Sequence, residues 1–266
     1  AWDYLGEAGI GAWSYPPDGQ AFNKPYPWLL ADVGAIDILG NIGAEAEYAA
    51  TVWGLRNKPY IAVRPLNHPG ITAAKSVWRG TNAIPSWSWK NCEGNKTIVE
   101  VYSNSDIVEL FINGKSIGKK KTKNFKAYFK VKYTPGNITA AAYNSSGTET
   151  GRTQLLSAAG KIKICLKPEK NNAKAGEIVY VDVSLIGENG IIESNADAKI
   201  NVFIENGELL AFGSANPRTE ENYLSGSFTT YYGRALAVVL CKNSGKTIIH
   251  ATALNMEETH AEIVII

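Results

Sequence analysis

The stretch Trp2–Glu7, near the start of the chain, holds two acids that could do chemistry. Asp3 and Glu7 lie four positions apart in it. A carboxyl pair cleaves a glycosidic bond only when the fold holds the two groups about 5 to 10 Å apart on either side of that bond. Spacing along the chain does not supply this geometry, so the residues alone leave both readings open, general acid–base chemistry and structural acids in a turn.

The elements that must position these acids alternate as in a β/α protein. Loops, short apolar runs and one expected helix alternate over residues 1–70, and the helix is predicted at residues 44–53. Its apolar face is predicted to comprise Ala44, Tyr48 and Val52, with Ala49 and Trp53 beside them. A region this short and rich in loops does not form a core of its own.

From about residue 76, apolar residues recur at every second position. Phe125 and Phe129 alternate with Lys126 and Lys130, the pattern of a half-buried antiparallel strand. Asn113-Gly114 lies between two such runs and predicts a type I′ hairpin turn. The spacing of strands and polar turns predicts an immunoglobulin-like β-sandwich of about seven strands over residues 71–160.

Residues 161–266 show the same alternation of apolar strands and polar turns, which predicts a second β-sandwich at the C-terminal end. Asn206-Gly207 predicts a second hairpin. Across the turn at residues 243–245, apolar residues are expected to face one another: Leu236, Val238 and Leu240 on one side, Ile249, Ala251 and Ala253 on the other. The predicted fold class is mainly β, with two immunoglobulin-like β-sandwiches behind residues 1–70.

Composition excludes several classes of protein. The 266 residues include 45% hydrophobic and 20% charged residues, and the net charge of +2 gives no reason to expect nucleic acid or an anionic membrane as partner. The longest apolar run, residues 235–241, is far below the ~20 residues of a membrane helix. The cysteines and histidines lack the spacings of a disulfide framework or a metal site, so no metal or cofactor is expected. These residues are Cys92, Cys165, Cys241, His68, His250 and His260. Cys165 and Cys241 each lie in an apolar strand-like run and are expected to be buried free thiols.

Two surface patterns leave alternatives open. Five lysines flanked by Phe125 and Tyr128 could suggest nucleic acid, but their place on a hairpin and a strand favours a solvated sheet face. They are Lys119, Lys120, Lys121, Lys123 and Lys126. Three tryptophans, Trp78, Trp87 and Trp89, could form a sugar-binding platform, but packing at a domain seam is the favoured interpretation.

The N-terminal stretch resembles the end of the eighth barrel strand and its loop in glycoside hydrolase family 2, the bacterial β-galactosidase-like enzymes. The motifs that carry the resemblance are Trp2–Glu7, Lys24–Trp28, Gly34–Gly40, a helix ending in Val52-Trp53-Gly54, and Ile61–Pro65. The resemblance implies that residues 1–70 are strand 8 and helix 8 of a (β/α)8 barrel. It also implies that Trp2, Asp3 and Glu7 lie close to the substrate. The family's Asn-x-Lys motif for glucuronides is represented only by Asn23-Lys24, which argues against a glucuronide substrate.

The remaining chain resembles the C-terminal domains of the same enzymes. The motifs are Trp87-Ser88-Trp89, Thr97–Asn104 and Val108–Gly118 for the first sandwich, and Gly213–Pro217 and Gly233–Ala235 for the second. The resemblance implies an accessory region of a retaining glycosidase acting on terminal β-galactosides or related β-glycosides. The family's two catalytic glutamates precede the Trp-Asp-Tyr motif, so we expect no catalytic residue here and no activity from this chain alone. The alternative is a non-catalytic carbohydrate-binding or adhesion module.

The resemblance also sets expectations about partners and location. The expected partner is a β-linked glycan, bound through the larger enzyme, with no nucleic acid and no membrane. An exposed barrel remnant would leave a large apolar patch, so residues 1–65 are expected to fold back on the first sandwich or to be buried in a homo-oligomer. A bacterial protein that is periplasmic or secreted is favoured over a cytoplasmic one.

Overall fold

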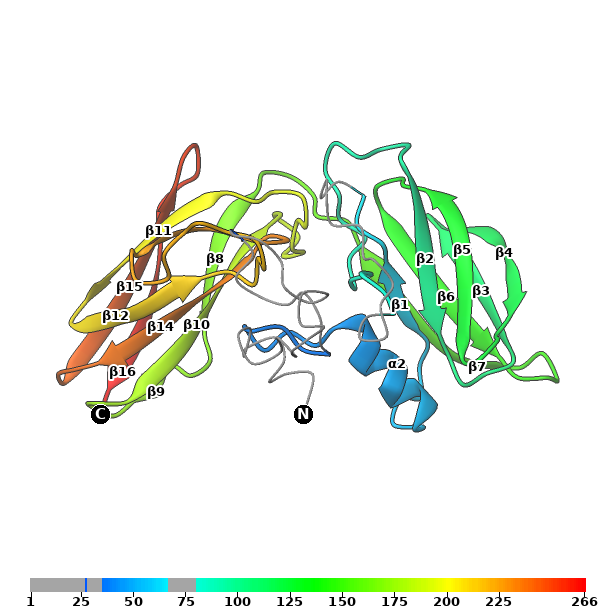
Figure 1. Ribbon diagram of the computed structural model, residues 1–266, viewed down its shortest axis with the longest axis horizontal. Helices are drawn as coiled ribbons and strands as arrows, with labels where there is room; N and C mark the ends of the chain where they lie inside the picture. Colours follow the sequence, from blue (N-terminus) through cyan, green and yellow to red (C-terminus); the bar gives the residue numbers. More distant parts are fainter. Residues whose placement is uncertain (1–26, 28–34, 67–79) are drawn as a thin grey trace, which may run out of the picture. The chain divides into compact units, whose positions relative to one another are not determined.

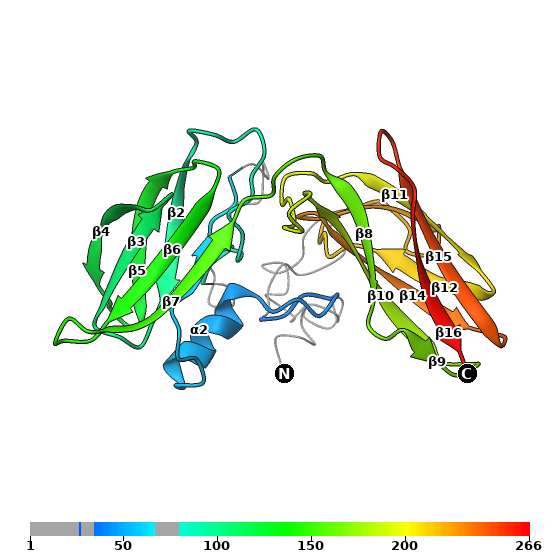
Figure 2. The same cartoon turned by 180° about the vertical axis from the view of Figure 1, so that it is seen from behind.

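The computed structural model describes Pro27, residues 35–66 and residues 80–266. The chain divides into two compact units, with the boundary between Ser157 and Ala158, and Pro27 belongs to the second unit. Both units are built almost entirely of antiparallel strands (Figures 1 and 2). The prediction of a mainly β fold with two β-sandwiches is therefore confirmed.

The first unit is a sandwich of a three-stranded and a four-stranded sheet. The three-stranded sheet has the order β1 (Tyr60–Val63), β2 (Lys96–Tyr102), β5 (Lys126–Lys132). The other sheet has the order β4 (Lys115–Lys121), β3 (Ile107–Ile112), β6 (Asn137–Tyr143), β7 (Glu149–Leu156). Six of these seven strands lie within residues 71–160, where about seven were predicted, and the seventh is β1. β1 lies inside the range predicted as the barrel remnant, yet it pairs with β2, and the domain limits themselves stay a prediction.

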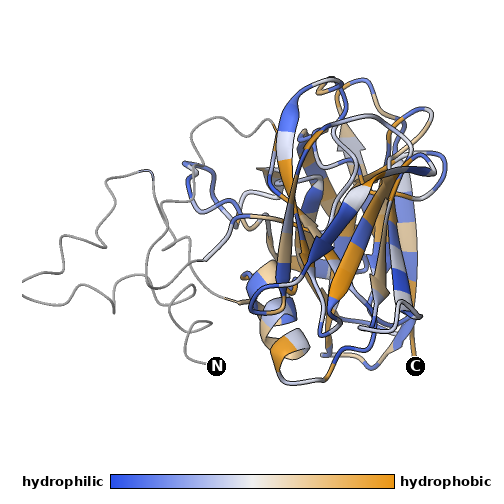
Figure 3. Cartoon of the chain, turned by 90° about the vertical axis from the view of Figure 1, so that its right-hand side faces the viewer, coloured by the Kyte–Doolittle hydropathy of each residue, from blue (hydrophilic) through white to orange (hydrophobic). Residues whose placement is uncertain are grey.

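Alternating burial along the strands builds the core of this sandwich. On β5, Ala127, Phe129 and Val131 are buried while the side chains between them point outward. Figure 3 shows the same alternation of hydrophilic and hydrophobic residues on the strands of the first sandwich. A strand that packs on a core with one face and meets solvent with the other has this period of two.

The hairpin predicted at Asn113-Gly114 is confirmed. Asn113 has φ 49° and Gly114 has φ 77°, the two positive values that a type I′ turn requires, and the turn joins β3 to β4. The Asn113 amide also ties the turn to the next strand. Its Nδ2 donates to the Pro135 carbonyl at 2.9 Å and its Oδ1 accepts from the Asn137 amide at 2.8 Å.

The predicted helix is α2 (Ala44–Val52), which covers the outer face of β1 and β2. Ala44 and Thr51 are buried, and Tyr48 packs edge-on against Tyr102 with ring centroids 5.5 Å apart. The prediction of the apolar face was wrong at its C-terminal end. Val52 and Trp53 are 39% and 79% exposed, because the helix docks through the side that carries Thr51.

A buried carboxylate lies under this helix layer. Glu100 on β2 is 1% exposed, and its Oε1 accepts from Arg64 Nε at 2.8 Å and from the Thr81 hydroxyl at 2.8 Å. Its Oε2 accepts from the Tyr102 hydroxyl at 2.9 Å. Burial and the adjacent carboxylate raise the pKa of Tyr102 well above its ordinary value. The network therefore connects Arg64, which follows β1, and Thr81 with Glu100 on β2.

The second unit is a sandwich of a four-stranded and a five-stranded sheet. The first has the order β12 (Gly207–Gly213), β14 (Arg234–Cys241), β10 (Ile178–Ile186), β8 (Lys163–Pro168). The second has the order β13 (Ser227–Thr229), β11 (Lys199–Glu205), β15 (Gly245–Ala253), β16 (Thr259–Ile265), β9 (Asn172–Ala173). One continuous apolar core, which includes Phe212, Phe228 and Ile249, lies between the sheets.

Two predictions for this sandwich were wrong. Asn206-Gly207 does not close a hairpin, because β11 and β12 belong to different sheets and the chain crosses between them at Asn206. The residue still has a positive φ of 52°, and its Nδ2 donates to the Lys246 carbonyl at 3.1 Å. Asn-Gly supplies a sharp reversal in either setting, so the dipeptide alone does not identify the partner strand.

The inward face of β14 is the opposite of the predicted one. Ala235, Ala237, Val239 and Cys241 point into the core, while Leu236, Val238 and Leu240 lie half-buried on the outer face. Every position of this strand after Arg234 is apolar, so periodicity could not choose between the two faces.

The described part of the chain contains no helix long and apolar enough to cross a membrane. All three cysteines are free thiols, and Cys92 and Cys241 are buried. Cys165 is partly exposed, so the prediction of a buried thiol is confirmed for Cys241 and wrong for Cys165.

Candidate functional site

The residues predicted to lie close to the substrate, Trp2, Asp3 and Glu7, fall outside the described residues, as does most of the motif Lys24–Trp28. Pro27 is the described residue of that motif, and its backbone carbonyl accepts a hydrogen bond from the amide of Thr219 at 3.0 Å. Thr219 is 6% exposed and lies in the long connection between β12 and β13 of the second sandwich. The C-terminal sandwich thus binds a segment that is nearly two hundred positions earlier in the sequence.

The loop that presents Thr219 is held by side-chain to backbone hydrogen bonds. Asn216 Oδ1 accepts from the Arg218 amide at 3.0 Å, and Thr219 Oγ1 accepts from the Glu221 amide at 3.1 Å. Asn222 Oδ1 accepts from the Leu224 amide at 2.9 Å. Such short-range bonds let Asn and Thr replace backbone partners in a turn. The run Asn216–Asn222 is therefore a set of linked turns that aims the Thr219 N–H at Pro27.

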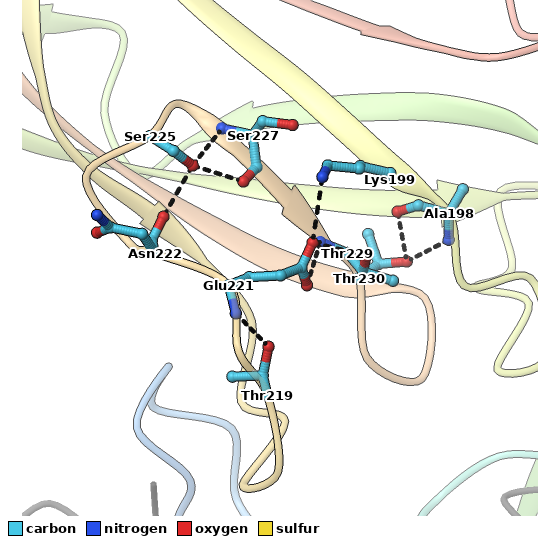
Figure 4. Close-up of polar contacts among 9 residues, drawn as sticks. All are labelled: Ala198, Lys199, Thr219, Glu221, Asn222, Ser225, Ser227, Thr229 and Thr230. Carbon is cyan, nitrogen blue, oxygen red and sulfur yellow. Dashed lines mark hydrogen bonds and ion pairs between the residues drawn. The ribbon is translucent and has the colours of Figure 1, made fainter. Parts of the chain in front are cut away.

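Glu221 anchors this loop to the five-stranded sheet (Figure 4). Its carboxylate accepts from the Thr229 amide at 3.0 Å and from the Thr229 hydroxyl at 3.0 Å, and Lys199 Nζ lies 3.9 Å away. Thr230, the next residue, exchanges hydrogen bonds with the backbone of Ala198 at 3.0 Å. Both oxygens of Glu221 are used within its own unit, which is the arrangement of a structural acid.

Stacked aromatic rings hold the end of this loop against the core of the second sandwich. The Tyr223 ring stacks on Phe228 with centroids 4.8 Å apart, and its hydroxyl donates to the Ser214 carbonyl at 3.4 Å. Any side chain at Gly213 would collide with the Tyr223 ring. Burial, together with the nearby Glu221 carboxylate, raises the pKa of Tyr223. Ser214 is fully buried, and its Oγ has no hydrogen-bond partner.

The motif at Gly233 adopts a second turn that glycine makes possible. Tyr232 and Gly233 have φ values of 51° and 70°, and the Gly233 amide donates to Asp197 Oδ1 at 2.7 Å. A Cβ at Gly233 would lie 2.5 Å from the Glu193 carbonyl oxygen. Glycine is needed here because the backbone adopts a left-handed conformation against the carbonyl of Glu193, which lies in the connection between β10 and β11.

The two motifs that carried the resemblance in this domain, at residues 213–217 and 233–235, therefore lie on one connected loop system. Sequence reasoning did not find Thr219, Glu221 or Asp197, whose roles depend on contacts between distant segments. The nearest signal was the density of Asn, Thr and Glu at residues 216–222, which is typical of a structured turn.

The structure also brings together residues that seemed scattered. His250 stacks on Phe203 with ring centroids 4.3 Å apart, and its two ring nitrogens lie 3.2 Å from Glu205 and 3.0 Å from Glu258. His260 is beside it, at 6.1 Å between centroids. Even so, the described residues hold no group of three or more His, Cys, Asp or Glu side chains that could bind a metal ion. His68 falls outside the described part of the chain.

Two of the three tryptophans do not belong to an exposed platform. Trp87 and Trp89 are both fully buried. Trp87 Nε1 donates to the Thr134 carbonyl at 3.0 Å and Trp89 Nε1 to the Ser86 carbonyl at 3.3 Å. Both rings are therefore packed within the first unit, while packing at a domain seam stays a prediction, and Trp78 lies outside the described residues.

Comparisons with known proteins follow this division of the chain. Residues 162–262 match the family described as glycoside hydrolase family 2 C-terminal domain 5, and residues 94–151 match a domain of unknown function, DUF4982. The beta-galactosidase BoGH2A of Bacteroides ovatus is 29% identical over 181 residues, which is 65% of this chain and 21% of that protein.

Solved structures give the same result. A glycosyl hydrolase family 2 member from Bacteroides cellulosilyticus superposes with a TM-score of 0.81 at 29% identity, covering 99% of this chain and 34% of that one. A beta-glycosidase from Bacteroides vulgatus shares the fold, with a TM-score of 0.71 at 22% identity over 90% of this chain and 29% of its own. The chain spans about a fifth of the curated relative and about a third of these structures. By these comparisons the chain corresponds to the C-terminal region of glycoside hydrolase family 2 enzymes.

Proposed function

We propose that the chain is the C-terminal accessory region of a retaining glycosidase acting on terminal β-galactosides or related β-glycosides, and that it does not hydrolyse them alone. The observation that carries the proposal is the hydrogen bond from the Thr219 amide to the Pro27 carbonyl. Through it, the family's C-terminal sandwich holds a segment that, by resemblance, follows the eighth strand of the catalytic barrel.

The proposed role of the sandwich is to position the rim of the sugar pocket. Active sites of such barrels lie at the carboxyl ends of the strands, in the loops that follow them. Residues 24–28 belong, by resemblance, to such a loop, and Thr219 supplies a fixed donor for it. Trp2, Asp3 and Glu7 are proposed to line the same rim. A misplaced rim lowers catalysis even when the reacting groups are intact.

The chemistry itself is proposed to come from two glutamates upstream of Trp2. A retaining mechanism needs two carboxyl groups about 5 to 5.5 Å apart, one free to accept the sugar and one free to move a proton. Glu221 does not fit either role, because its oxygens are bound by Thr229 and balanced by Lys199. Glu100 is likewise committed to buried partners in the first sandwich.

The docking can be tested on the chain itself. Thr219→Pro removes the N–H that Pro27 accepts, while the matched Thr219→Ser keeps both the N–H and the hydroxyl that Glu221 uses. We expect chymotrypsin to cut after Trp28 several-fold faster in the proline variant than in the serine variant, with circular dichroism unchanged in both. Equal cleavage rates would mean that the sandwich does not hold this loop.

A further inference from the structure

The most concentrated run of charge in the sequence belongs to the first sandwich, whereas the loop system described above belongs to the second. Residues 115–132 contain eight lysines and no acid, so they carry a charge of +8, whereas the whole chain has a net charge of only +2. We call these eight residues the lysine belt: Lys115, Lys119, Lys120, Lys121, Lys123, Lys126, Lys130 and Lys132. The rest of the chain is therefore net acidic.

The belt follows two strand edges that lie next to each other. β4 ends one sheet and β5 ends the other, and the two are neighbours in Figures 1 and 2. Lys120 Nζ donates to the Tyr128 carbonyl at 2.6 Å and so joins the two edges. All members of the belt except Lys126 are exposed. β4 alone gives the belt a length of roughly 20 Å, at about 3.3 Å per residue.

Most of these charges are not neutralised within the described part of the chain. Lys119 lies 3.4 Å from Glu109, and the Lys126 ammonium lies over the Tyr48 ring at 3.5 Å. Lys121 and Lys123, like Lys115, Lys130 and Lys132, form no ion pair with another described residue. Lysines at sheet edges also discourage edge-to-edge pairing, which is the structural alternative to a binding role.

A strained aromatic residue stands in the middle of the belt. Asn124 and Phe125 form the turn before β5, with φ values of 50° and 62°. A positive φ is an outlier for a bulky side chain such as phenylalanine, and strained residues of this kind gather at ligand-binding sites. The Phe125 side chain is 38% exposed, and Tyr128 nearby is 45% exposed.

The surrounding structure holds this turn in place. The Tyr48 hydroxyl of α2 donates to the Asn124 carbonyl at 3.1 Å, and the Ser103 amide donates to the Phe125 carbonyl at 2.9 Å. The Thr122 hydroxyl donates to the Ser105 carbonyl at 2.7 Å. None of these bonds uses the Phe125 side chain, so the fold fixes the backbone of the turn and presents the ring to solvent.

We propose that the lysine belt, with Phe125 and Tyr128, is a binding surface for an acidic polysaccharide, a chain of uronate or sulfated sugars. Unpaired ammonium groups attract the acid groups along such a chain, and exposed rings offer a surface on which the apolar face of a sugar can pack. The choice of a glycan over other polyanions rests on the proposed function in a glycosidase. The surface would hold the enzyme on an acidic glycan while its catalytic domain acts.

The test measures binding by the 266-residue chain, independent of any hydrolysis. Polygalacturonate is the probe, fully methyl-esterified polygalacturonate is its neutral counterpart, and single-stranded DNA and anionic vesicles are the competing polyanions. We expect binding to polygalacturonate that weakens steeply with salt, weaker binding to DNA and vesicles, and none to the ester. Lys121→Gln/Lys123→Gln should weaken it about tenfold, while Lys163→Gln/Lys167→Gln, on the second sandwich, should not change it.

Phe125→Gly separates a binding role from a structural one. Glycine accepts the positive φ, so the variant should melt at the same or a higher temperature, yet bind polygalacturonate about tenfold more weakly. A lower melting temperature with unchanged binding would show that Phe125 serves the hairpin. No binding to polygalacturonate, or equal binding to DNA that ignores Phe125, would overturn the proposal. Either result leaves the role of the Thr219–Pro27 contact unaffected.

Discussion

Replacing Glu100 by glutamine should destabilise the first sandwich strongly although the two side chains have the same shape. Glu100 is 1% exposed and accepts hydrogen bonds from Arg64, Thr81 and Tyr102. The substitution keeps the volume and one oxygen acceptor but removes the negative charge. Arg64, 31% exposed at its side chain, then loses its partner at the edge of a buried site.

The magnitude follows from the three bonds. A hydrogen bond to a charged group contributes about 1.5 to 3 kcal/mol, roughly twice a neutral one, so three bonds lose about 1 kcal/mol each. Partial solvation of Arg64 reduces this total, which leaves an expected loss of about 2 kcal/mol. For a domain of about 100 residues this corresponds to a fall in Tm of about 8 to 16 °C. Glu100→Ala should cost about 3 kcal/mol or more, because it leaves two hydroxyls and a cation without an acceptor.

Thermal unfolding followed by circular dichroism and calorimetry measures this effect. The matched control is Glu149→Gln in the same sandwich, since Glu149 pairs with Arg152 at 2.8 Å but both side chains are largely exposed. Exposed pairs contribute at most about 1 kcal/mol. If the Glu100 and Glu149 variants melt within a degree or two of each other, the buried network does not stabilise the sandwich as reasoned.

Three further predictions concern other parts of the chain. Asn113→Ala should cost about 1 to 2 kcal/mol, because the side chain bonds Pro135 and Asn137 and suits φ 49°; an unchanged urea midpoint would refute this. Gly233→Ala should cost about 2 kcal/mol more than Gly190→Ala, since both have positive φ, 70° and 77°, but only Gly233 would place its Cβ against a carbonyl. Equal losses in chemical denaturation would contradict that reading. Burial raises the pKa of Cys241, so a thiol reagent at pH 8 should label at most Cys165 in the native chain and all three cysteines in denaturant; rapid native labelling of Cys241 would count against the packing described.

Local patterns predicted the fold well where a strand packs one face on the core. β5 alternates cleanly in sequence, and its burial alternates in the structure. Asn113-Gly114 closes the expected hairpin because both residues tolerate positive φ. Patterns failed where they were ambiguous: β14 is apolar on both faces, and Asn206-Gly207 reverses the chain between sheets instead of within one.

The candidate site was less predictable because its contacts join distant segments. The motifs at residues 213–217 and 233–235 marked the right region, but nothing local indicates that Thr219 reaches Pro27 or that Glu221 reaches Thr229. Glu100 illustrates the same limit, since a lone acid in an apolar strand gives no sign of its partners at Arg64 and Thr81.

We propose that this chain supports catalysis without performing it. The most direct measurement is hydrolysis of 4-nitrophenyl β-galactoside by the purified chain, with its intact mass determined on the same sample. We expect no release of nitrophenolate above the buffer rate at the mass of the 266-residue chain. Turnover that stays with that mass through a second purification step would contradict it, and Asp3 and Glu7 would then be the first residues to substitute.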